Sequence, residues 1–361
     1  MASIIIADMT GRYDGRDLER RPLGATEANV ILCARELARR GHAVSVHTNG
    51  DEDFLHKGVR WRPLSAAPAP TCDVYVAVQQ TSLLDFVPRP KRRAIWVLWG
   101  ANQLRHYKKA PRMWRYRPTP VLMSQAQVRD YWPVLPKRRE ISVIHLPMPA
   151  DVRGFKPLVE PPPRRAIFAS NPQRNLRALV ELWAERILPH VADAVLDVYG
   201  VHPLAEGEDA WTEWAGSVLP PDMPDAVKAS VRVHPSAPRP KLLEAMRAAR
   251  VMLYLGHKCE AFCMSLAEAQ ALGVPAVIAP VAALPERVID GVTGFHQADP
   301  AAFAQAAVRL LTDDALWRRQ HEAALKLQQG ITVEEYARRF EAAILGGEPD
   351  RSEAGADAAA A

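Results

Sequence analysis

The chain has 361 residues, of which 48% are hydrophobic and 24% charged, and its net charge is +5. This composition is typical of globular proteins, and the length is too great for one ordinary core, so we expect two domains of about 150 residues each. Four cysteines exclude a disulfide scaffold and favour a reducing cytoplasm. The sequence shows neither a signal-peptide pattern nor an apolar run long enough for a transmembrane helix.

The first half of the chain alternates short apolar runs with helical patterns. Residues 3–9 form a β-branched run typical of a buried parallel strand. Apolar residues from Val30 to Ala38 recur at helical spacing, Gly41 stands where a helix would end, and residues 43–48 alternate as a strand. This order predicts a strand–helix–strand unit of a parallel sheet. Further strands are predicted at 73–78, 94–100, 120–124 and 141–146.

A segment at 156–165 in which four of ten residues are proline predicts a stiff linker, and a second α/β series follows it. Its strands are predicted at 166–170, 194–200, 231–235, 251–256 and 275–280, and its helices at 175–188, 240–249, 265–273, 300–312, 314–328 and 332–345. We therefore predict an α/β protein with two Rossmann-like, doubly wound parallel-sheet domains, 1–155 and 156–345, that face a cleft. The last helix is expected to pack back on the first domain. Residues 346–361 are predicted to be a disordered tail.

Ligands of open α/β sheets bind at the carboxyl ends of strands, so the strand-to-helix loops are where a site is expected. The strand at 251–256 leads into a loop and then into a helix that begins near Ser265. A helix N-terminus presents N–H groups and a partial positive charge, which bind phosphate. Glu260 precedes this helix and Glu268 lies one turn inside it. A bound diphosphate would have one carboxylate on each side, and each could accept hydrogen bonds from a pair of sugar hydroxyls.

The spacing of these two glutamates is part of a longer pattern. Seven residues separate Glu260 from Glu268, Phe262 follows the first by two positions, and the letters ALGVPAV close the segment. This pattern and its continuation at 279–295 resemble the donor-binding signature of glycosyltransferase family 4. The resemblance implies the GT-B fold and a retaining enzyme in which Glu260 binds the donor sugar and Glu268 the ribose hydroxyls. It also implies that the diphosphate is held by the backbone amides of Phe262, Cys263, Met264 and Ser265.

Other interpretations of the same segment stay open. Cys263 stands where many family members have glycine, a change that backbone N–H chemistry tolerates. Ser265 and Glu268 also have the spacing of a capping box, in which the glutamate side chain reaches back to the serine N–H. His257, Cys259 and Cys263 lie within seven residues. Because no second Cys/His cluster accompanies them, we expect apolar packing of the cysteines rather than a metal site.

Two other loops match the family pattern in part. Arg174 directly precedes a predicted helix, where family members place a cation that neutralises the leaving diphosphate. Ser170 stands near the place of a second family arginine, so Lys258 or a residue of the first domain is expected to supply that charge. Many relatives carry a histidine where this chain has Gly100. On the acceptor side a glycine-rich turn is represented by Gly24, Ala25 and Thr26, with Thr26 predicted to cap the next helix.

The segment 89–117 contains many Lys and Arg residues and no acid. Such a run suits an anionic partner, either phospholipid head groups or a lipid-linked diphosphate, and a solvated basic face without a partner fits it equally well. Trp and Tyr residues interleave with the cations, as in proteins that bind single-stranded nucleic acid. Aromatic residues at strand and helix spacing are more often core residues, so no nucleic-acid partner is expected.

Together these features predict a hexosyltransferase-type glycosyltransferase of the EC 2.4 class, with Glu260 and Arg174 as catalytic residues. The expected donor is a UDP- or GDP-linked sugar, and the expected acceptor is a glycan, a lipid-linked or another acceptor in bacterial cell-surface polysaccharide synthesis. The enzyme is expected in the cytoplasm, with peripheral contact to the inner face of an anionic membrane through 89–117. No metal or other cofactor is predicted, since the helix dipole and Arg174 can stabilise the diphosphate. The alternatives are a non-catalytic glycosyltransferase-like binder and a basic nucleic-acid-binding protein.

Overall fold

The structure is a computed structural model that describes residues 1–21, 23–136, 141–200, 223–235 and 237–346. The predicted tail at 346–361 lies almost wholly outside the described residues. Contacts between residues divide the chain into two compact units. The first comprises 1–147 and 331–361, and the second comprises 148–330.

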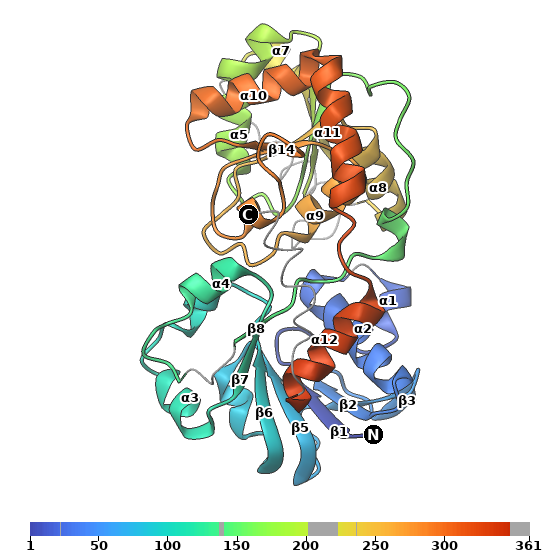
Figure 1. Cartoon of the computed structure of the whole chain (residues 1–361), viewed down its shortest axis with the longest axis vertical. Coiled ribbons are helices and arrows are strands. Elements are labelled where there is room, and N and C mark those ends of the chain that lie inside the picture. The colour runs from blue at the N-terminus through green and yellow to red at the C-terminus, as the bar shows by residue number, and fades with distance from the viewer. Residues whose placement is uncertain (22, 137–140, 201–222, 236, 347–361) are drawn as a thin grey trace. The chain divides into compact units, whose positions relative to one another are not determined.

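The first unit is built on a sheet of eight strands (Figure 1). Their order is β3-β4-β2-β1-β5-β6-β7-β8, and every pair is parallel except β3 with β4. The bounds are β1 Ser3–Ala7, β2 Ala43–Thr48, β3 Phe54–His56, β4 Val59–Pro63, β5 Thr71–Val78, β6 Arg89–Trp96, β7 Thr119–Leu122 and β8 Ser142–Val143. The helices of this unit are α1 Asp17–Arg20, α2 Ala25–Arg39, α3 Ala110–Tyr116, α4 Gln125–Asp130 and α12 Val333–Leu345, with 3-10 turns η1 Thr81–Asp85 and η2 Ala101–Leu104.

Helices cover both faces of this sheet, which explains why its central strands are apolar throughout. On one face Ile5 and Ala7 of β1 belong to a buried cluster that includes Met113 of α3. Alternate residues of a strand point to opposite faces, so Ile4 and Ile6, which are also buried, lie on the other face.

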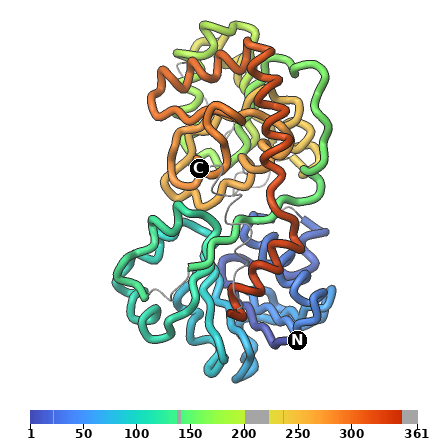
Figure 2. Tube along the Cα trace, in the orientation of Figure 1, coloured from blue at the N-terminus to red at the C-terminus, as the bar shows by residue number. Residues whose placement is uncertain are grey.

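The last helix, α12, packs against α2, β6 and β7 of the first unit. The ring of Phe340 lies 4.6 Å from that of Trp96 between centroids. Glu341 accepts from Arg40 at 2.5 Å and lies 3.2 Å from His42. Figure 2 shows this final segment, in red, beside the blue N-terminal segments.

The second unit contains a fully parallel sheet in the order β11-β10-β9-β12-β13-β14. Its strands are β9 Arg165–Ala169, β10 Val195–Tyr199, β11 Val231–His234, β12 Val251–Tyr254, β13 Ala276–Ile278 and β14 Gly294–His296. Its helices are α5 Leu176–Leu182, α7 Asp225–Ser230, α8 Arg239–Arg247, α9 Met264–Ala271, α10 Pro300–Thr312 and α11 Asp314–Leu327, with short turns η3 Ala150–Val152, η4 Trp183–Ile187 (a π turn), η5 Leu188–His190 and η6 Leu284–Glu286. Helix α10 packs on β12, β13 and β14, whereas α9 contacts α8 and α11 (Figure 1). The predicted fold class of two doubly wound parallel-sheet units is thus confirmed.

Some elements differ from the sequence-based expectation. Strand β6 begins at Arg89 rather than at 94, because pairing with β5 extends from Thr71↔Arg89 to Val78↔Trp96. The polar start of the basic run is therefore sheet backbone. The β3–β4 hairpin was not predicted, since its short strands alternate weakly. The helix expected at 175–188 consists of α5 followed by the π turn and a 3-10 turn.

Candidate active site

The candidate site of the second unit forms where two neighbouring strands end. β9 and β12 are hydrogen-bonded in parallel, with Ala166 opposite Val251 and Ile167 opposite Met252. The carboxyl ends of parallel neighbours meet at one edge of the sheet, so the loop after β9 lies beside the loop after β12. Asn175 braces the two loops, because its Nδ2 donates to the carbonyl of Gly256 at 2.6 Å.

Glu260 is the centre of the contacts in these loops, although only 9% of the residue is exposed. Its Oε1 accepts from the hydroxyl of Tyr254 at 2.6 Å and lies 3.4 Å from Nε of Arg174. The hydroxyls of Tyr254 and Ser170 lie 3.0 Å apart. Burial raises the pKa of Tyr254, so the phenol stays protonated and available as a donor. The structure thus brings together Ser170, Arg174 and Glu260, which the sequence had singled out.

The sequence did not predict a role in this cluster for two residues, Tyr254 and His257. Tyr254 lies within the predicted strand and carries no loop or motif signal. His257 lies 3.3 Å from Nη1 of Arg174 through its Nδ1. This contact makes His257 an orienting partner of the arginine rather than the metal ligand that its neighbouring cysteines suggested. Lys258 is exposed in the same loop.

Helix α9 begins at Met264, and its N-cap residue is Cys263. Cys263 has φ of 65°, in the left-handed region that favours glycine. This conformation gives a physical reason why a glycine stands here in the family that the sequence resembles. The side chains of Phe262 and Cys263 are buried, and burial raises the pKa of the Cys263 thiol to about 12. The thiol is therefore neutral and unreactive, and what the segment presents is backbone at a helix N-terminus.

Glu268 lies inside α9 and only 5% of it is exposed. Its Oε1 accepts from Nη1 of Arg239 at 2.7 Å. Burial raises the pKa of Glu268, and the neighbouring Arg239 offsets part of that effect. The capping-box interpretation is wrong, because Ser265 is the second residue of the helix rather than its N-cap, and the carboxylate faces Arg239.

In the first unit the predicted acceptor-side residues lie at the start of α2. Gly24 is the N-cap residue, and no side chain caps this helix. The expectation that Thr26 caps it is therefore wrong, since Thr26 lies in the first turn. Its Oγ1 instead accepts from the indole Nε1 of Trp99 at 3.3 Å. A Cβ at Gly24 would meet only the Glu27 carboxylate, which is the end of a flexible side chain, so close packing does not demand glycine there.

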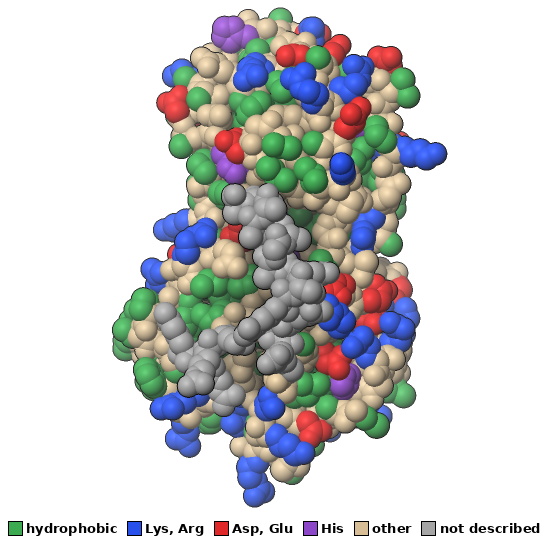
Figure 3. Space-filling view, in the orientation of Figure 1, with side chains coloured by type: hydrophobic (Ala, Val, Ile, Leu, Met, Phe, Trp, Pro, Cys, Tyr) green, Lys and Arg blue, Asp and Glu red, His purple; other side chains and the backbone are tan. Residues whose placement is uncertain are grey.

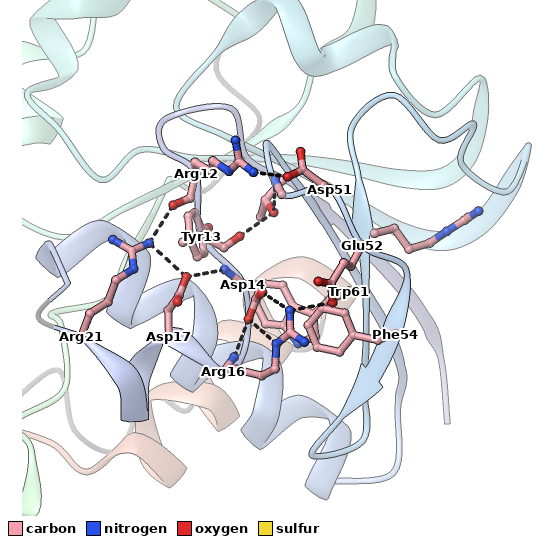
Figure 4. Close-up of a pocket in the computed structure, with 13 residues that line it drawn as sticks. Arg12, Tyr13, Asp14, Arg16, Asp17, Arg21, Asp51, Glu52, Phe54 and Trp61 are labelled. Carbon is pink, nitrogen blue, oxygen red and sulfur yellow. Dashed lines mark hydrogen bonds and ion pairs between the residues drawn. The ribbon is translucent and has the colours of Figure 1, made fainter.

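A cavity of about 450 Å³ opens in the first unit, and none of the predicted site residues lines it (Figure 4). Most of its charged groups are paired with each other: Arg12 with Asp51, Arg21 with Asp17, and Arg16 with Asp14 and Glu52. Arg16 also lies over the Phe54 ring, 3.9 Å from its centroid.

Within the described part of the chain, no group of three or more His, Cys, Asp and Glu side chains is arranged to hold a metal ion. In the same part, no helix combines the length and apolar character needed to span a bilayer.

Comparison with known sequences places the candidate site in a recognised segment. A family model described as Glycosyl transferases group 1 matches residues 164–313, which contain the second-unit site residues from Ser170 to Glu268. The D-inositol 3-phosphate glycosyltransferase of Thermobifida fusca (strain YX) is 35% identical over 106 residues, 29% of this chain and 24% of that protein. The protein of the same name from Xylanimonas cellulosilytica is 41% identical over 90 residues, 24% of this chain and 21% of its own length. The matches thus span about a quarter of these relatives.

Solved structures resemble the chain over nearly its whole length. Anabaena Alr3699/HepE, in complex with UDP and glucose, has a TM-score of 0.68 at 15% identity, covering 94% of this chain and 98% of that one. WaaG, a glycosyltransferase involved in lipopolysaccharide biosynthesis, has a TM-score of 0.67 at 15% identity, covering 95% and 100%. At such low identity these likenesses show the fold alone. They confirm the GT-B fold that the sequence resemblance implied.

Proposed function

We propose that this protein is a retaining glycosyltransferase that transfers a sugar from a nucleoside diphosphate sugar to an acceptor hydroxyl. The observation that carries the proposal is the cluster of Arg174, Glu260 and Tyr254 beside the N-terminus of α9. It lies within the segment that matches the glycosyltransferase family model. Among the possible nucleoside diphosphates of the donor, UDP is the first to test, since the Anabaena neighbour was solved with UDP and glucose.

Each group of the cluster has a task in such a transfer. The N-terminus of α9 and the guanidinium of Arg174 stabilise the diphosphate as it gains negative charge on departure. Glu260 accepts hydrogen bonds from sugar hydroxyls. Tyr254 holds that carboxylate in place, since it donates to one of its oxygens. In a retaining transfer the C1–O bond to the phosphate breaks and the acceptor oxygen bonds to C1 from the same face, while the departing phosphate oxygen takes the acceptor proton.

No metal enters this scheme, because helix N–H groups and Arg174 supply the positive field. The acceptor class is a glycan or lipid-linked acceptor of cell-surface polysaccharide synthesis in the bacterial cytoplasm. Membrane contact through 89–117 is supported by exposed Tyr107 and Trp114, which are 71% and 50% exposed beside exposed cations. Around α3 and α4, basic and hydrophobic side chains lie next to each other on the face shown in Figure 3. Such a mixture is typical of surfaces that bind lipid head groups.

Thermal unfolding with UDP, GDP, ADP and CMP tests the donor class. A ligand at about 100 times its dissociation constant adds roughly 2.7 kcal/mol to the free energy of unfolding, a shift of several degrees. We expect a shift with one nucleoside diphosphate that persists in excess EDTA. We expect Arg174→Ala to reduce sugar transfer about 100-fold. The matched control is Arg177→Ala, which removes an exposed arginine of the same loop–helix segment that pairs with Glu181.

The alternatives give different results in the same assays. Nucleotide binding without transfer to any acceptor supports a non-catalytic binder. The absence of nucleotide binding, together with salt-dependent binding to random DNA, supports the nucleic-acid-binding alternative and rejects the proposal. The anomeric configuration of a transferred sugar, measured by NMR, decides between retention and inversion.

A further inference from the structure

Arg239, the first residue of α8, bridges two carboxylates that lie far apart in the sequence. Its Nη1 donates to Oε1 of Glu268 at 2.7 Å. Its Nε and Nη2 donate to the two oxygens of Asp151 at 2.7 and 2.9 Å. All three residues belong to the second unit, and Asp151 lies in η3, close to the point where the chain enters that unit. None of the sequence features that point to a donor site includes Arg239.

The three side chains differ in burial, and this difference indicates which of the two carboxylates depends on Arg239. The side chain of Glu268 is 7% exposed, whereas those of Arg239 and Asp151 are 41% and 47% exposed. A carboxylate buried to this degree becomes protonated unless a cation or several donors stabilise its charge. Among the described residues, Arg239 is the cation in contact with Glu268. The exposed Asp151 needs no such partner, so the contacts of Arg239 stabilise the charge of Glu268.

The geometry of the bridge also fixes the orientation of the Glu268 carboxylate. The bidentate contact with Asp151 fixes the plane of the Arg239 guanidinium. A lysine, whose charge is a point without a plane, could not be oriented in this way. With that plane held by Asp151, Nη1 points at Oε1 of Glu268. An ionised carboxylate has about four acceptor positions, and Arg239 occupies one of them. The described residues contribute no hydrogen bond to Oε2, so this oxygen can receive the hydroxyls of a ligand.

We propose that Arg239 is a positioning residue of the donor site, which keeps Glu268 ionised and oriented so that it can select the ribose hydroxyls of a nucleoside diphosphate. This inference rests on the proposed function, because it assumes that Glu268 meets a ribose. It adds a residue to the site that acts through Glu268 and not through direct contact with the donor. Asp151 contributes indirectly, since it orients the guanidinium.

The experiment compares UDP with 2′-deoxy-UDP, and GDP with 2′-deoxy-GDP, by calorimetric titration of the full chain. The ratio of the two affinities measures recognition of the ribose hydroxyl and is insensitive to a general loss of folded protein. For a hydrogen bond to a charged group we expect the unaltered chain to prefer the ribonucleotide by about 10- to 100-fold. Arg239→Ala and Glu268→Ala are each expected to reduce this preference to less than about 3-fold. The double variant is expected to lose no more than either single variant, as for residues that act as one unit.

Three further variants separate positioning from structure. Arg239→Lys keeps a cation and is expected to restore part of the preference. Asp151→Asn is expected to reduce it by a smaller factor than Arg239→Ala. Lys241→Ala removes an exposed cation of the same helix and is expected to change nothing. In Arg239→Ala the remaining preference should also fall as the pH is lowered from 8 to 6, because an unpaired Glu268 takes up a proton more readily.

The outcomes are distinguishable. If the unaltered chain binds no nucleoside diphosphate, both the proposed function and this inference are rejected. If it prefers the ribonucleotide and Arg239→Ala keeps that preference, only the role of Arg239 is rejected. Tighter UDP binding by Arg239→Ala would also overturn it, because Arg239 would then compete with the ribose for Glu268. Thermal unfolding of each variant without ligand identifies any that fail to fold, in which case Arg239→Lys and Asp151→Asn carry the test.

Discussion

The phenol of Tyr254 donates a 2.6 Å hydrogen bond to Oε1 of Glu260, and its oxygen also lies 3.0 Å from Oγ of Ser170. One buried hydroxyl thus joins the last residue of β12 to the loops that follow β9 and β12. Since Glu260 is 9% exposed, its charge needs partners, and this bond provides one beside the contact with Arg174. The orientation of the proposed sugar-binding carboxylate therefore depends on a residue that belongs to the sheet.

Tyr254→Phe is expected to weaken both stability and transfer. The substitution leaves a buried carboxylate without one of its donors, which costs about 1–3 kcal/mol in the free energy of unfolding. We expect kcat to fall about tenfold or more, since the carboxylate becomes free to rotate. Urea unfolding and steady-state kinetics measure these effects. Tyr199→Phe is the control, because the Tyr199 ring stacks on His234 at 4.4 Å within the same sheet. Equal losses in the two variants would contradict the role of the Tyr254 hydroxyl.

The effect of a substitution at Cys263 on the free energy of unfolding should depend on the backbone conformation there rather than on the thiol. At φ of 65° a β-branched side chain is strained, so Cys263→Val is expected to lower the free energy of unfolding by about 1–3 kcal/mol. Cys263→Gly is expected to change it by less than about 1 kcal/mol, because relief of strain offsets the loss of a small buried side chain. Denaturant unfolding measures both. If valine is tolerated as well as glycine, the left-handed conformation does not govern this position.

Acid should destabilise the first unit partly through His47. Burial lowers the pKa of His47 to about 4, and the nearby Arg62 adds to the effect. The unfolded chain, with a pKa near 6.5, therefore binds a proton that the folded chain excludes, so stability is lost as the pH falls from about 6.5 towards 4. His47→Gln should remove about 1–3 kcal/mol of this pH dependence. Urea unfolding at pH 6.5 and 4.5 measures it, with the exposed His106→Gln as control. An unchanged slope in His47→Gln would exclude the histidine as its source.

The basic run gives a prediction about membranes. Several of its cations already have structural partners: Arg93 donates to the carbonyls of Leu84 and Val87, and Lys91 contacts Asp73 at 2.7 Å. Lys108, Arg115 and Arg117 are exposed, and their charged groups lie over the faces of aromatic rings. Reversal of these three charges to Glu should therefore abolish binding to phosphatidylglycerol vesicles at low salt, at about 1 kcal/mol per cation near the surface.

Vesicle flotation measures this binding, with phosphatidylcholine vesicles as the neutral comparison. A variant that reverses Lys91 instead is the control, since that cation is engaged in the sheet region by Asp73. If the unaltered chain does not float with anionic vesicles, segment 89–117 does not bind membranes and is a solvated basic face.

The sequence by itself determined the two α/β halves and the segment that holds the candidate-site residues. Apolar periodicity located α10 at 300–312 and β2 at 43–48 at the bounds that the structure has. The spacing of Glu260 and Glu268 and the place of Arg174 before a helix also followed from local order. Such features are local because a helix, a strand or a loop motif is specified by residues a few positions apart.

Contacts between residues far apart in the sequence were decided by the tertiary structure alone. Tyr254 meets Ser170, 84 residues away, because β9 and β12 are neighbours in the sheet although β10 and β11 separate them in the chain. Arg239 meets Glu268 because α8 packs on α9, and no spacing rule links their positions. The left-handed conformation of Cys263 likewise arises from how the loop after β12 must turn into α9. In each case strand order and helix packing select the partner, since burial of the apolar faces fixes which loops end side by side.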